Sequence, residues 1–365
     1  MGVPYEEQLR KKQASVIRLL GKFGHVDPIR GMENPMGCRC KATRTFSYDG
    51  KRTFSGIYEP ASHRLVPVTE CPMEHPAASA VLRTIHSLAV SLRIPAYNEE
   101  NGTGFLRHVL VRVGAATGEI LVVVVAAEPI FKQQKLFVQK LLAAHPAIRS
   151  VVLNVNPRFT PIVLGSREKV LFGPGYIEDR LSGLTFRISS RSFFQVNPAQ
   201  AEVLYGLAME MASLTGKERV LDAYCGTGTI GLTASLTAGE VMGVELTPDA
   251  VKDAIANARR NHIRSARFYT GDAGEFLEAL AAEKEPADVV FLDPPRSGSD
   301  ERFLSSLLTM SPQRIVYISC SPDTLARDLE TLTRGGYLTK RIVPVDMFPF
   351  TRHVETVVLM SRVKE

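Results

Sequence analysis

Hydrophobic positions recur with three different spacings along the chain. In residues 4–22 they recur every three or four positions beside a charged face, which predicts an amphipathic helix whose charged side is solvated. In residues 44–59 they alternate with polar positions on both sides of Asp49-Gly50, which is typical of a β-hairpin. A second hairpin is predicted to turn within residues 114–118. The third spacing, in the second half of the chain, consists of short continuous apolar runs.

The first half mixes these hairpins with helical patterns. Helices are predicted in residues 76–92 and 131–144, followed by the strand-like run VVLNVNP and a Gly- and Pro-rich link at residues 171–176. This mixture of elements predicts an α+β domain, which we place at residues 1–185.

From about Leu204 the apolar runs alternate with helical segments. They predict seven strands with helices between the first five, an order typical of a Rossmann-like α/β fold with a doubly wound parallel sheet. The last two strands are expected to finish one edge as a hairpin-like pair. We place this second domain at residues 186–365. The runs are RVLDAYC, EVMGVEL, ARFYTGD, DVVFLDPP, RIVYISC, LTKRIVPVDM and HVETVVLMSR.

The composition of the 365-residue chain excludes several protein classes. With 45% hydrophobic and 22% charged residues it is neither a disordered chain nor a fibrous one. The longest apolar run, residues 120–127, is far shorter than the roughly 20 residues of a membrane span. The first residues also lack the apolar stretch of a secretion signal. We therefore expect a cytoplasmic globular protein with no membrane contact.

Charge and cysteine usage narrow the function further. Residues 1–180 hold 24 Lys and Arg against 15 Asp and Glu, a net charge of +9, whereas residues 181–365 hold 20 against 23, a net charge of −3. This asymmetry favours contact between the first half and a polyanion, although an ordinary basic surface gives the same count. The five cysteines are too sparse and uneven for a disulfide framework, so each is a packed thiol, a ligand or a nucleophile.

Chemistry-bearing residues follow the predicted strands of the second domain. The first strand runs into DAYCGTGTIG, where glycines allow close approach of a ligand to the backbone and a helix follows. Glu245 ends the second strand, where a carboxylate can accept the hydroxyls of a ribose. Asp272 and Asp293 end the third and fourth strands. Residues 226–231, GTGTIG, have the GxGxxG spacing of dehydrogenases that bind NAD, so this segment alone leaves such an enzyme open beside an S-adenosylmethionine-dependent methyltransferase. The motifs that follow favour S-adenosylmethionine over NAD.

Cys320 ends the fifth strand and belongs to the same predicted sheet edge as Asp293. A cysteine between a strand and a helix lies in the positive field of the helix, which favours the nucleophilic thiolate. An isolated cysteine is more often a small buried apolar group. Its position beside the DPPRSG segment favours the nucleophile here.

Six motifs together resemble the family of S-adenosylmethionine-dependent RNA uracil-C5 methyltransferases, which modify tRNA and rRNA. They are SFFQVNPAQAE, DAYCGTGTIG, GVEL, FLDPPRSG, YISCSP and RHVETVVLM, and their order covers most of the chain. The resemblance implies a class I methyltransferase fold, S-adenosyl-L-methionine as cofactor, Cys320 as nucleophile and Glu355 as base. We expect no metal at the site. The residues that match the cofactor positions of the family are Gln195, Tyr224, Thr229, Glu245, Asp272 and Asp293.

The implied reaction accounts for these residue types. Uracil C5 becomes nucleophilic only after a thiolate adds at C6, and the C5 proton must later leave so that the thiolate is expelled. Arg296 is a candidate to balance the charge that develops at uracil O4. The target uridine must lie outside any base stack, so a loop or a flipped base in structured RNA is expected. Candidate phosphate contacts in the basic half are Arg39, Lys41, Arg44, Lys51 and Arg52.

Two features depart from the family pattern. Many members begin with a small RNA-binding β-barrel, for which this chain starts too late, and some hold a four-cysteine iron–sulfur cluster. Cys71 matches the last ligand of that cluster, whereas Cys38 and Cys40 have the wrong spacing and are predicted to lie inside a strand. One matching ligand cannot hold such a cluster, so none is expected.

Other functions remain open at the level of sequence. The DPP segment is similar to the motif of amino-group methyltransferases, which have an aromatic residue where Arg296 stands and need neither Cys320 nor Glu355. Cytosine-C5 enzymes use a second cysteine in this segment, which the chain lacks. A non-catalytic ribosome-assembly factor is the alternative outside enzymes. Within the family, DMFPFTRHVE favours 23S rRNA over tRNA as the substrate, and a monomer is expected.

Overall fold

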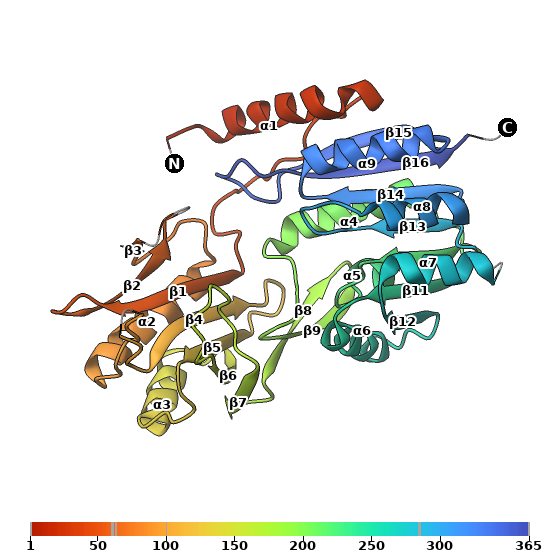
Figure 1. Ribbon diagram of the computed structural model, residues 1–365. Helices are drawn as coiled ribbons and strands as arrows, with labels where there is room; N and C mark the ends of the chain where they lie inside the picture. The colour runs from red at the N-terminus through yellow and green to blue at the C-terminus, as the bar shows by residue number, and fades with distance from the viewer. Residues whose placement is uncertain (1, 60–61, 63, 100, 284–285, 364–365) are drawn as a thin grey trace. The chain divides into compact units, whose positions relative to one another are not determined.

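The computed structural model describes residues 2–59, 62, 64–99, 101–283 and 286–363. Contacts divide the chain into two compact units, shown in Figure 1. We call residues 1–35, 181–185 and 199–365 the parallel-sheet unit, and residues 36–180 and 186–198 the mixed-sheet unit. The chain therefore crosses between units after residues 35, 180, 185 and 198, whereas the sequence predicted one boundary at 185.

The described residues of the parallel-sheet unit contain a seven-stranded sheet in the order β12-β11-β10-β13-β14-β16-β15. The strands from β12 to β14 run parallel, and β16 is antiparallel to both of its neighbours. The predicted doubly wound sheet with a hairpin at its edge is confirmed. The strands are β10 (Arg219–Ala223), β11 (Glu240–Glu245), β12 (Ala266–Thr270), β13 (Val289–Leu292), β14 (Arg314–Ser319), β15 (Tyr337–Val345) and β16 (Glu355–Arg362).

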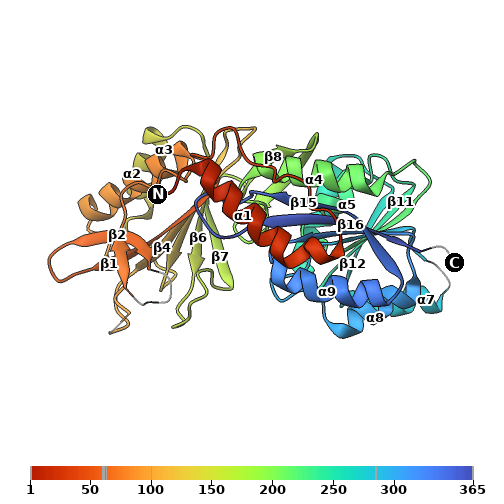
Figure 2. The same ribbon diagram turned by 90° about the horizontal axis from the view of Figure 1, so that it is seen from above.

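Helices cover both faces of this sheet. Figure 2 shows α7, α8, α9 and α1 on one face and α4 and α5 on the other. Alternate strand residues such as Leu221, Val290 and Tyr317 pack with Leu277 and Leu325 in one core cluster, because successive strand side chains point to opposite faces. The helices are α1 (Tyr5–Leu20), α4 (Pro198–Ala212), α5 (Thr229–Ala234), α6 (Pro248–Arg260), α7 (Ala273–Ala282), α8 (Glu301–Met310) and α9 (Pro322–Arg334), and a 3₁₀ turn, η1 (Gly21–Phe23), follows α1.

The first helix corrects one expectation. Its charged face is not fully solvated, because Lys12 is 4% exposed and its Nζ lies 2.5 Å from Oδ1 of Asp346, which is fully buried. Lys12 also donates to the backbone oxygen of Phe348, and Tyr5 donates to the second oxygen of Asp346. These bonds attach α1 to the segment that leads into β16.

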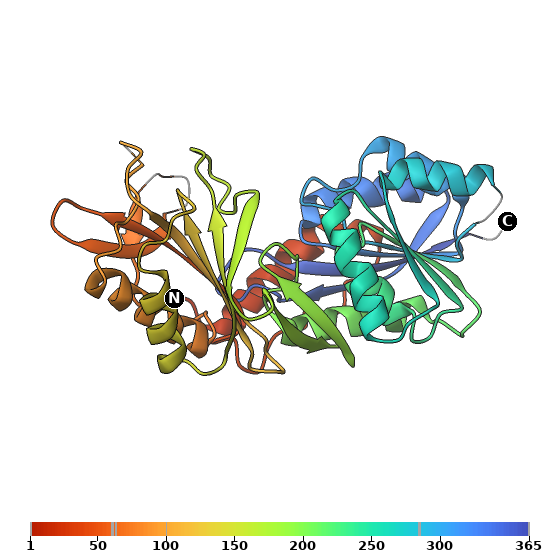
Figure 3. The ribbon, with the colours of Figure 1, turned by 90° about the horizontal axis from the view of Figure 1, so that it is seen from below.

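In the mixed-sheet unit the described residues form a seven-stranded sheet in the order β3-β2-β1-β4-β5-β6-β7, in which only β5 and β6 pair in parallel. Both predicted hairpins are present. Helices α2 (Pro76–Ser91) and α3 (Gln134–Ala144) lie on the same face of this sheet (Figure 3). The strands are β1 (Lys41–Tyr48), β2 (Thr53–Tyr58), β3 (Leu65–Pro67), β4 (Leu106–Val113), β5 (Ile120–Ala126), β6 (Ile148–Val155) and β7 (Arg167–Phe172).

The core of the mixed-sheet unit lies under its two helices. Every residue of β4 and β5 is buried. β5 is a continuous apolar run, as expected for a central strand, whereas β4 also buries Arg107, His108 and Arg112. Val109 and Val124 pack against Val81 and Ile85 of α2 in one cluster. The helix begins where the His75 ring accepts from the amide of Ala77 and Pro76 occupies the first turn.

Two local expectations differ from the structure. The link at 171–176 is mostly the end of β7 and a turn into β8 (Tyr176–Leu181), which pairs with β9 (Leu184–Ser189) as a separate ribbon. Cys38 and Cys40 precede β1 instead of lying inside a strand. Among the residues that the structure describes, no helix has both the length and the apolar character needed to cross a membrane.

Candidate active site

The strand order of the parallel-sheet unit creates a switch point between β10 and β13. On one side of β10 the strands continue to β11 and β12, and on the other side to β13 and β14. Open α/β sheets bind ligands outside the carboxyl ends of the strands at such a point. Tyr224 directly follows β10 and Asp293 directly follows β13, so both predicted residues lie at this edge.

The turn after β10 is shaped by backbone conformations that favour glycine. Gly226 and Gly228 have φ values of 55° and 83°, and Tyr224 has a φ of 66°. A side chain added at Gly226 would meet no atom within 4 Å, so there is open space beside its backbone. At Gly228 an added side chain would press on Phe268 and Ala254. The first glycine therefore leaves room for a ligand, and the second permits close packing.

Two carboxylates hold this turn. Glu245, the last residue of β11, accepts from the amide of Gly226 at 3.1 Å and from the amide of Thr247 at 2.8 Å. Asp222 is fully buried and accepts from the amide of Gly231 at 2.7 Å. Its other oxygen, Oδ1, has no hydrogen-bond partner among the described residues. Burial raises the pKa of the Asp222 carboxyl to about 8.

The remaining predicted residues of this unit have identifiable places. Thr229 begins α5, and its hydroxyl lies 3.3 Å from that of Tyr205. Asp272 is exposed and caps α7 by accepting from the amide of Glu275. The Tyr224 ring packs against Phe303 with centroids 5.2 Å apart. Burial raises the pKa of Tyr224 to about 12, so its hydroxyl remains protonated.

Strand register brings Cys320 and Glu355 to neighbouring positions. In the antiparallel ladder of β14 and β16, Ser319 is opposite Thr356. Cys320 follows Ser319 and Glu355 precedes Thr356, so the two candidates extend from the same end of the ladder. Glu355 is 4% exposed, and Cys320 is half-buried.

Charges at this edge act on one another. Burial, with added repulsion from the Asp293 carboxyl, raises the pKa of Glu355 to about 8 against the opposing effect of the Arg296 guanidinium. Burial also raises the pKa of the Cys320 thiol, with added repulsion from Glu355 and Asp293 and an opposing effect of Arg296. Asp293 itself has a pKa raised by burial to about 7. Cys320 and Glu355 therefore both lie within electrostatic range of Asp293 and Arg296.

Sequence reasoning missed the residues that hold the loop carrying Arg296. Asp328 of α9 is fully buried and accepts from the amide of Ser299 at 2.8 Å and from the Tyr317 hydroxyl at 2.6 Å. The neighbouring Arg327 donates to the backbone oxygens of Ser297 and Ser299. The available signal was the position of Asp328 beside Leu325, Leu329 and Leu332 on the buried face of α9.

Comparison with known proteins shows the family of this chain. The family described as tRNA (uracil-5-)-methyltransferase matches residues 4–363. The chain belongs to this family. An uncharacterized RNA methyltransferase of Halalkalibacterium halodurans is 43% identical over 98% of this chain and 79% of its own length. One from Caldanaerobacter subterraneus is 40% identical over 98% of this chain and 80% of its own length.

A solved structure supports the same assignment. The tRNA (uracil-54, C5)-methyltransferase of Pyrococcus abyssi, in complex with S-adenosyl-L-homocysteine, matches with a TM-score of 0.83 and 28% identity. The match covers 98% of this chain and 84% of the archaeal one. The chain is thus an enzyme of the S-adenosyl-L-methionine-dependent RNA uracil-C5 methyltransferase family, with a class I methyltransferase fold.

The edge of the parallel sheet fits the cofactor of this methyltransferase family. The open space beside Gly226 adjoins the Glu245 carboxylate that its amide contacts. Asp222 holds the first turn of α5, which follows it, through the amide of Gly231. Gln195, the other predicted cofactor residue, is 9% exposed and lies between β9 and α4 in the mixed-sheet unit.

The cysteines outside the site have different environments in this methyltransferase. Burial raises the pKa of Cys40 to about 12, and the pKa of the buried Cys225 is also strongly raised. Both therefore stay as neutral thiols, the form that packs and does not react. Cys71 is half-buried in the turn before α2. The described residues contain no group of three or more His, Cys, Asp or Glu side chains arranged to hold a metal ion.

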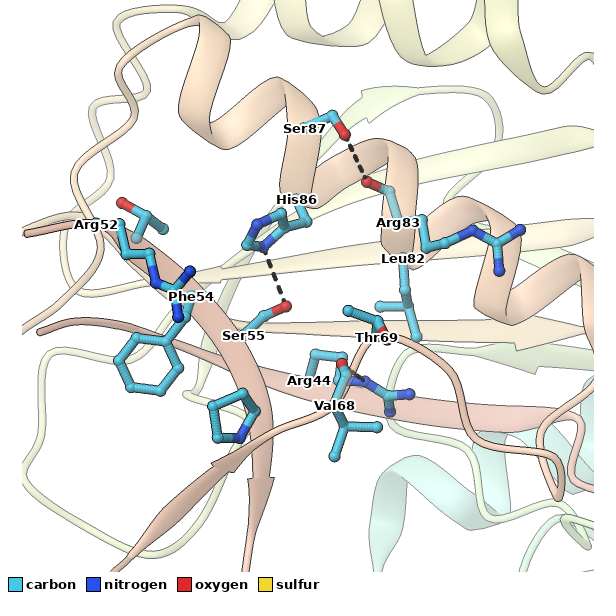
Figure 4. A pocket seen from close by; sticks show the side chains of 12 residues that line it. Arg44, Arg52, Phe54, Ser55, Val68, Thr69, Leu82, Arg83, His86 and Ser87 are labelled. Carbon is cyan, nitrogen blue, oxygen red and sulfur yellow. Dashed lines mark hydrogen bonds between the residues drawn. The ribbon is translucent and has the colours of Figure 1, made fainter.

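The predicted basic surface is corrected at Arg44. This side chain is 2% exposed and makes two hydrogen bonds to the Glu74 carboxylate, so it is an internal ion pair and not a phosphate contact. Figure 4 shows Arg44 and Arg52 on the wall of a pocket of about 360 Å³, where the Ser55 hydroxyl meets the His86 ring at 3.2 Å. Arg52 and Lys51 are exposed, whereas Arg39 and Lys41 are half-buried.

Proposed function

We propose that this enzyme transfers a methyl group to C5 of one uridine in structured RNA, giving 5-methyluridine, and that it does so in the cytoplasm. The observation that supports this most directly is the shared end of β14 and β16, where Cys320 and Glu355 adjoin and the Glu355 carboxylate raises the pKa of the Cys320 thiol. A nucleophile beside a base is the pair that addition and elimination at one uracil ring require.

In this mechanism Cys320 and Glu355 act in sequence. The Cys320 thiolate forms a bond to uracil C6, and the electrons of the C5–C6 double bond move toward C5 and O4. When bound, S-adenosyl-L-methionine supplies an electrophilic methyl group for C5. Glu355 then takes the proton from C5, the double bond re-forms, and the bond between C6 and Sγ breaks to restore the thiolate. The proton on Glu355 passes to solvent before the next turnover.

The pKa values suit these roles. A pKa near 8 for Glu355 makes it a stronger base than an ordinary carboxylate, yet part of it is ionised near neutral pH. Arg296 lowers the pKa of both Cys320 and Glu355, and it is an exposed cation available to the charge that develops at uracil O4. Asp328 and Arg327 fix the loop that presents it.

We assign cofactor binding to Gln195, Tyr224, Thr229, Glu245, Asp272 and Asp293. Glu245 is placed to accept ribose hydroxyls through the lone pairs that its two amide bonds leave unused. The mixed-sheet unit, which holds the whole excess of positive charge, is assigned to RNA binding. We favour 23S rRNA as substrate, on the DMFPFTRHVE segment. The likeness to the archaeal tRNA enzyme favours tRNA as the alternative.

The test is methyl transfer from labelled S-adenosyl-L-methionine to separated rRNA and tRNA that lack 5-methyluridine. Nucleoside mass analysis identifies the product, and Cys320→Ala is the control. The expected result is labelled 5-methyluridine in one RNA and none with the variant. Label at another atom, or unchanged label with Cys320→Ala, would contradict the proposal. Cofactor binding without transfer to either RNA would favour the non-catalytic assembly role.

A further inference from the structure

A hollow of about 590 Å³ lies wholly within the mixed-sheet unit and is not used by the mechanism. This volume is in the usual range of small-ligand sites. Strands β1, β2, β3 and β4 contribute to its walls, together with the loops that follow α2 and β6. Its walls include Tyr48, Tyr58, Tyr97, Phe159, Arg107 and His108.

Three of the five aromatic side chains that line it are open to solvent, whereas Phe46 and Tyr97 are buried. Phe159 is 80% exposed, Tyr48 is 49% exposed and Tyr58 is 37% exposed. Single exposed apolar residues are common, but three rings at the rim of one hollow form a surface that a flat ligand can cover. Successive RNA bases stack on such rings without strong sequence preference.

A β-bulge places a fixed cation in the same wall. The register of β4 against β5 shifts between Leu106 and His108, so Arg107 is the extra residue. Arg107 is 2% exposed, donates to the backbone oxygens of Asn156 and Arg158, and stacks over the Tyr97 ring at 4.6 Å. These contacts fix the guanidinium and make this part of the wall rigid.

His108 supplies a neutral polar group. Burial, with added repulsion from Arg107, lowers its pKa to about 4, so the imidazole is uncharged at neutral pH. Nδ1 lies 3.1 Å from the Thr45 hydroxyl. A neutral imidazole can donate or accept one hydrogen bond at its other nitrogen, according to its tautomer, and base edges offer both kinds of partner.

The charges of the wall distinguish a base from a phosphate. Arg107 and Glu99, whose closest charged atoms are 3.9 Å apart, are the charged residues among those that line it. The pocket of Figure 4 instead has Arg44, Arg52 and Arg83 on its walls. A hollow with balanced charge, exposed rings and a neutral imidazole suits an uncharged planar group.

We propose that this hollow binds an unstacked RNA base, with Phe159 and the exposed tyrosines as the stacking surface. The inference rests on the proposed function, because it names how the RNA substrate is held. It adds a stacking contact with the face of a base to the phosphate contacts that the sequence predicted for the basic residues of this unit.

The test uses the full chain and the variants Phe159→Ala, Phe159→Trp and Phe172→Ala. Phe172 is 41% exposed at the edge of the same sheet but does not line the hollow, so it is the matched control. Fluorescein-labelled, unmodified fragments of tRNA and rRNA are titrated with each protein at several salt concentrations. We expect Phe159→Ala to raise Kd by about 5- to 100-fold, with wild-type affinity for Phe172→Ala and for Phe159→Trp.

The salt dependence separates stacking from charge. Loss of a stacked base leaves the slope of log Kd against log salt unchanged, whereas loss of a phosphate contact reduces it by about 0.7 to 0.9. Arg52→Ala provides that comparison. Unchanged affinity for Phe159→Ala and Tyr58→Ala, or a reduced salt slope with them, would overturn the proposal. Absence of methyl transfer by the wild type would instead count against the proposed function, since binding is measured separately.

Discussion

Buried carboxylates have opposite surroundings in the two units. In the mixed-sheet unit the Glu74 carboxylate meets the Arg44 guanidinium through two hydrogen bonds, and Ser79 donates a third bond at 3.1 Å. In the parallel-sheet unit Glu355 is buried beside the carboxyl of Asp293, and the opposing cation, Arg296, is exposed. A paired carboxylate maintains structure, whereas carboxyls buried beside each other acquire pKa values near neutrality that chemistry can use.

The largest expected effect follows from replacing Glu355, the proposed base in the parallel-sheet unit. Glu355→Gln keeps the size of the side chain but cannot take the C5 proton, so we expect turnover to fall roughly 10²- to 10⁴-fold. Addition of Cys320 and methyl transfer remain possible, so a covalent RNA adduct should accumulate. Denaturing gel electrophoresis with labelled RNA measures it. Adding Cys320→Ala should abolish the adduct, and a Glu355→Gln protein with wild-type turnover would exclude this role.

The next effect tests how much the buried ion pair of Arg44 and Glu74 contributes to stability. Glu74→Gln leaves the Arg44 guanidinium buried without a counter-ion, and we expect the free energy of unfolding to fall by about 3–5 kcal/mol. Urea denaturation measures this loss. The double variant Arg44→Met with Glu74→Leu should recover most of it, because both charges are then absent. A loss below about 1 kcal/mol would mean that the pair is accessible to water, like a surface ion pair.

Arg44 also shows how far sequence could predict this contrast. The prediction that Arg44 contacts phosphate was wrong. Buried and less buried residues alternate along β1, and Arg44 shares the buried face with Ala42 and Phe46. The alternation alone therefore indicated an internal cation. The sequence could not indicate that its partner is Glu74, because no local pattern connects a strand residue to the turn before α2.

The site of the parallel-sheet unit was more predictable for a physical reason. Carboxyl ends of parallel strands share one edge, so Tyr224, Glu245 and Asp293 could be grouped from the strand pattern before any contact was known. Pairing across long stretches of chain was not predictable. Lys12 and Asp346 are separated by 334 positions, and only the folded chain brings them together. The same applies to Gln195, because the chain crosses between units on both sides of it.

A smaller effect sharpens the role of the exposed cation. Arg296 lowers the pKa of both Cys320 and Glu355, so Arg296→Gln should raise both values further. Activity requires the thiolate and the carboxylate, so kcat/KM should increase with pH through about 8 in the wild type. In the variant this rise should move to higher pH, with a several-fold loss at pH 7 that is partly recovered at pH 9.

The control for this pH profile is Arg302→Gln. Arg302 is an exposed arginine that pairs with Glu275 and Glu278 and does not act on Cys320 or Glu355. Its variant should keep the wild-type profile. If Arg296→Gln lowers the rate equally at every pH, the guanidinium acts on the charge at uracil O4 alone and not on the pKa values.

The last effect is a change in how stability depends on pH, and it isolates Asp222, a buried carboxyl whose pKa no counter-ion among the described residues lowers. Asp222 has its pKa raised by burial to about 8, whereas in the unfolded chain it ionises near pH 4. Between these values the folded protein binds the extra proton, so the free energy of unfolding falls as pH rises, by up to about 1.4 kcal/mol per pH unit. Asp222→Asn keeps an oxygen for the Gly231 amide and should remove that part of the slope between pH 5 and 8.

Asp49→Asn is the opposite control, because amide hydrogen bonds from Arg52 and Lys51 lower the pKa of the exposed Asp49 and confine its effect to acid pH. Equal slopes for Asp222→Asn and the wild type in urea denaturation would show that Asp222 is already ionised in the folded protein.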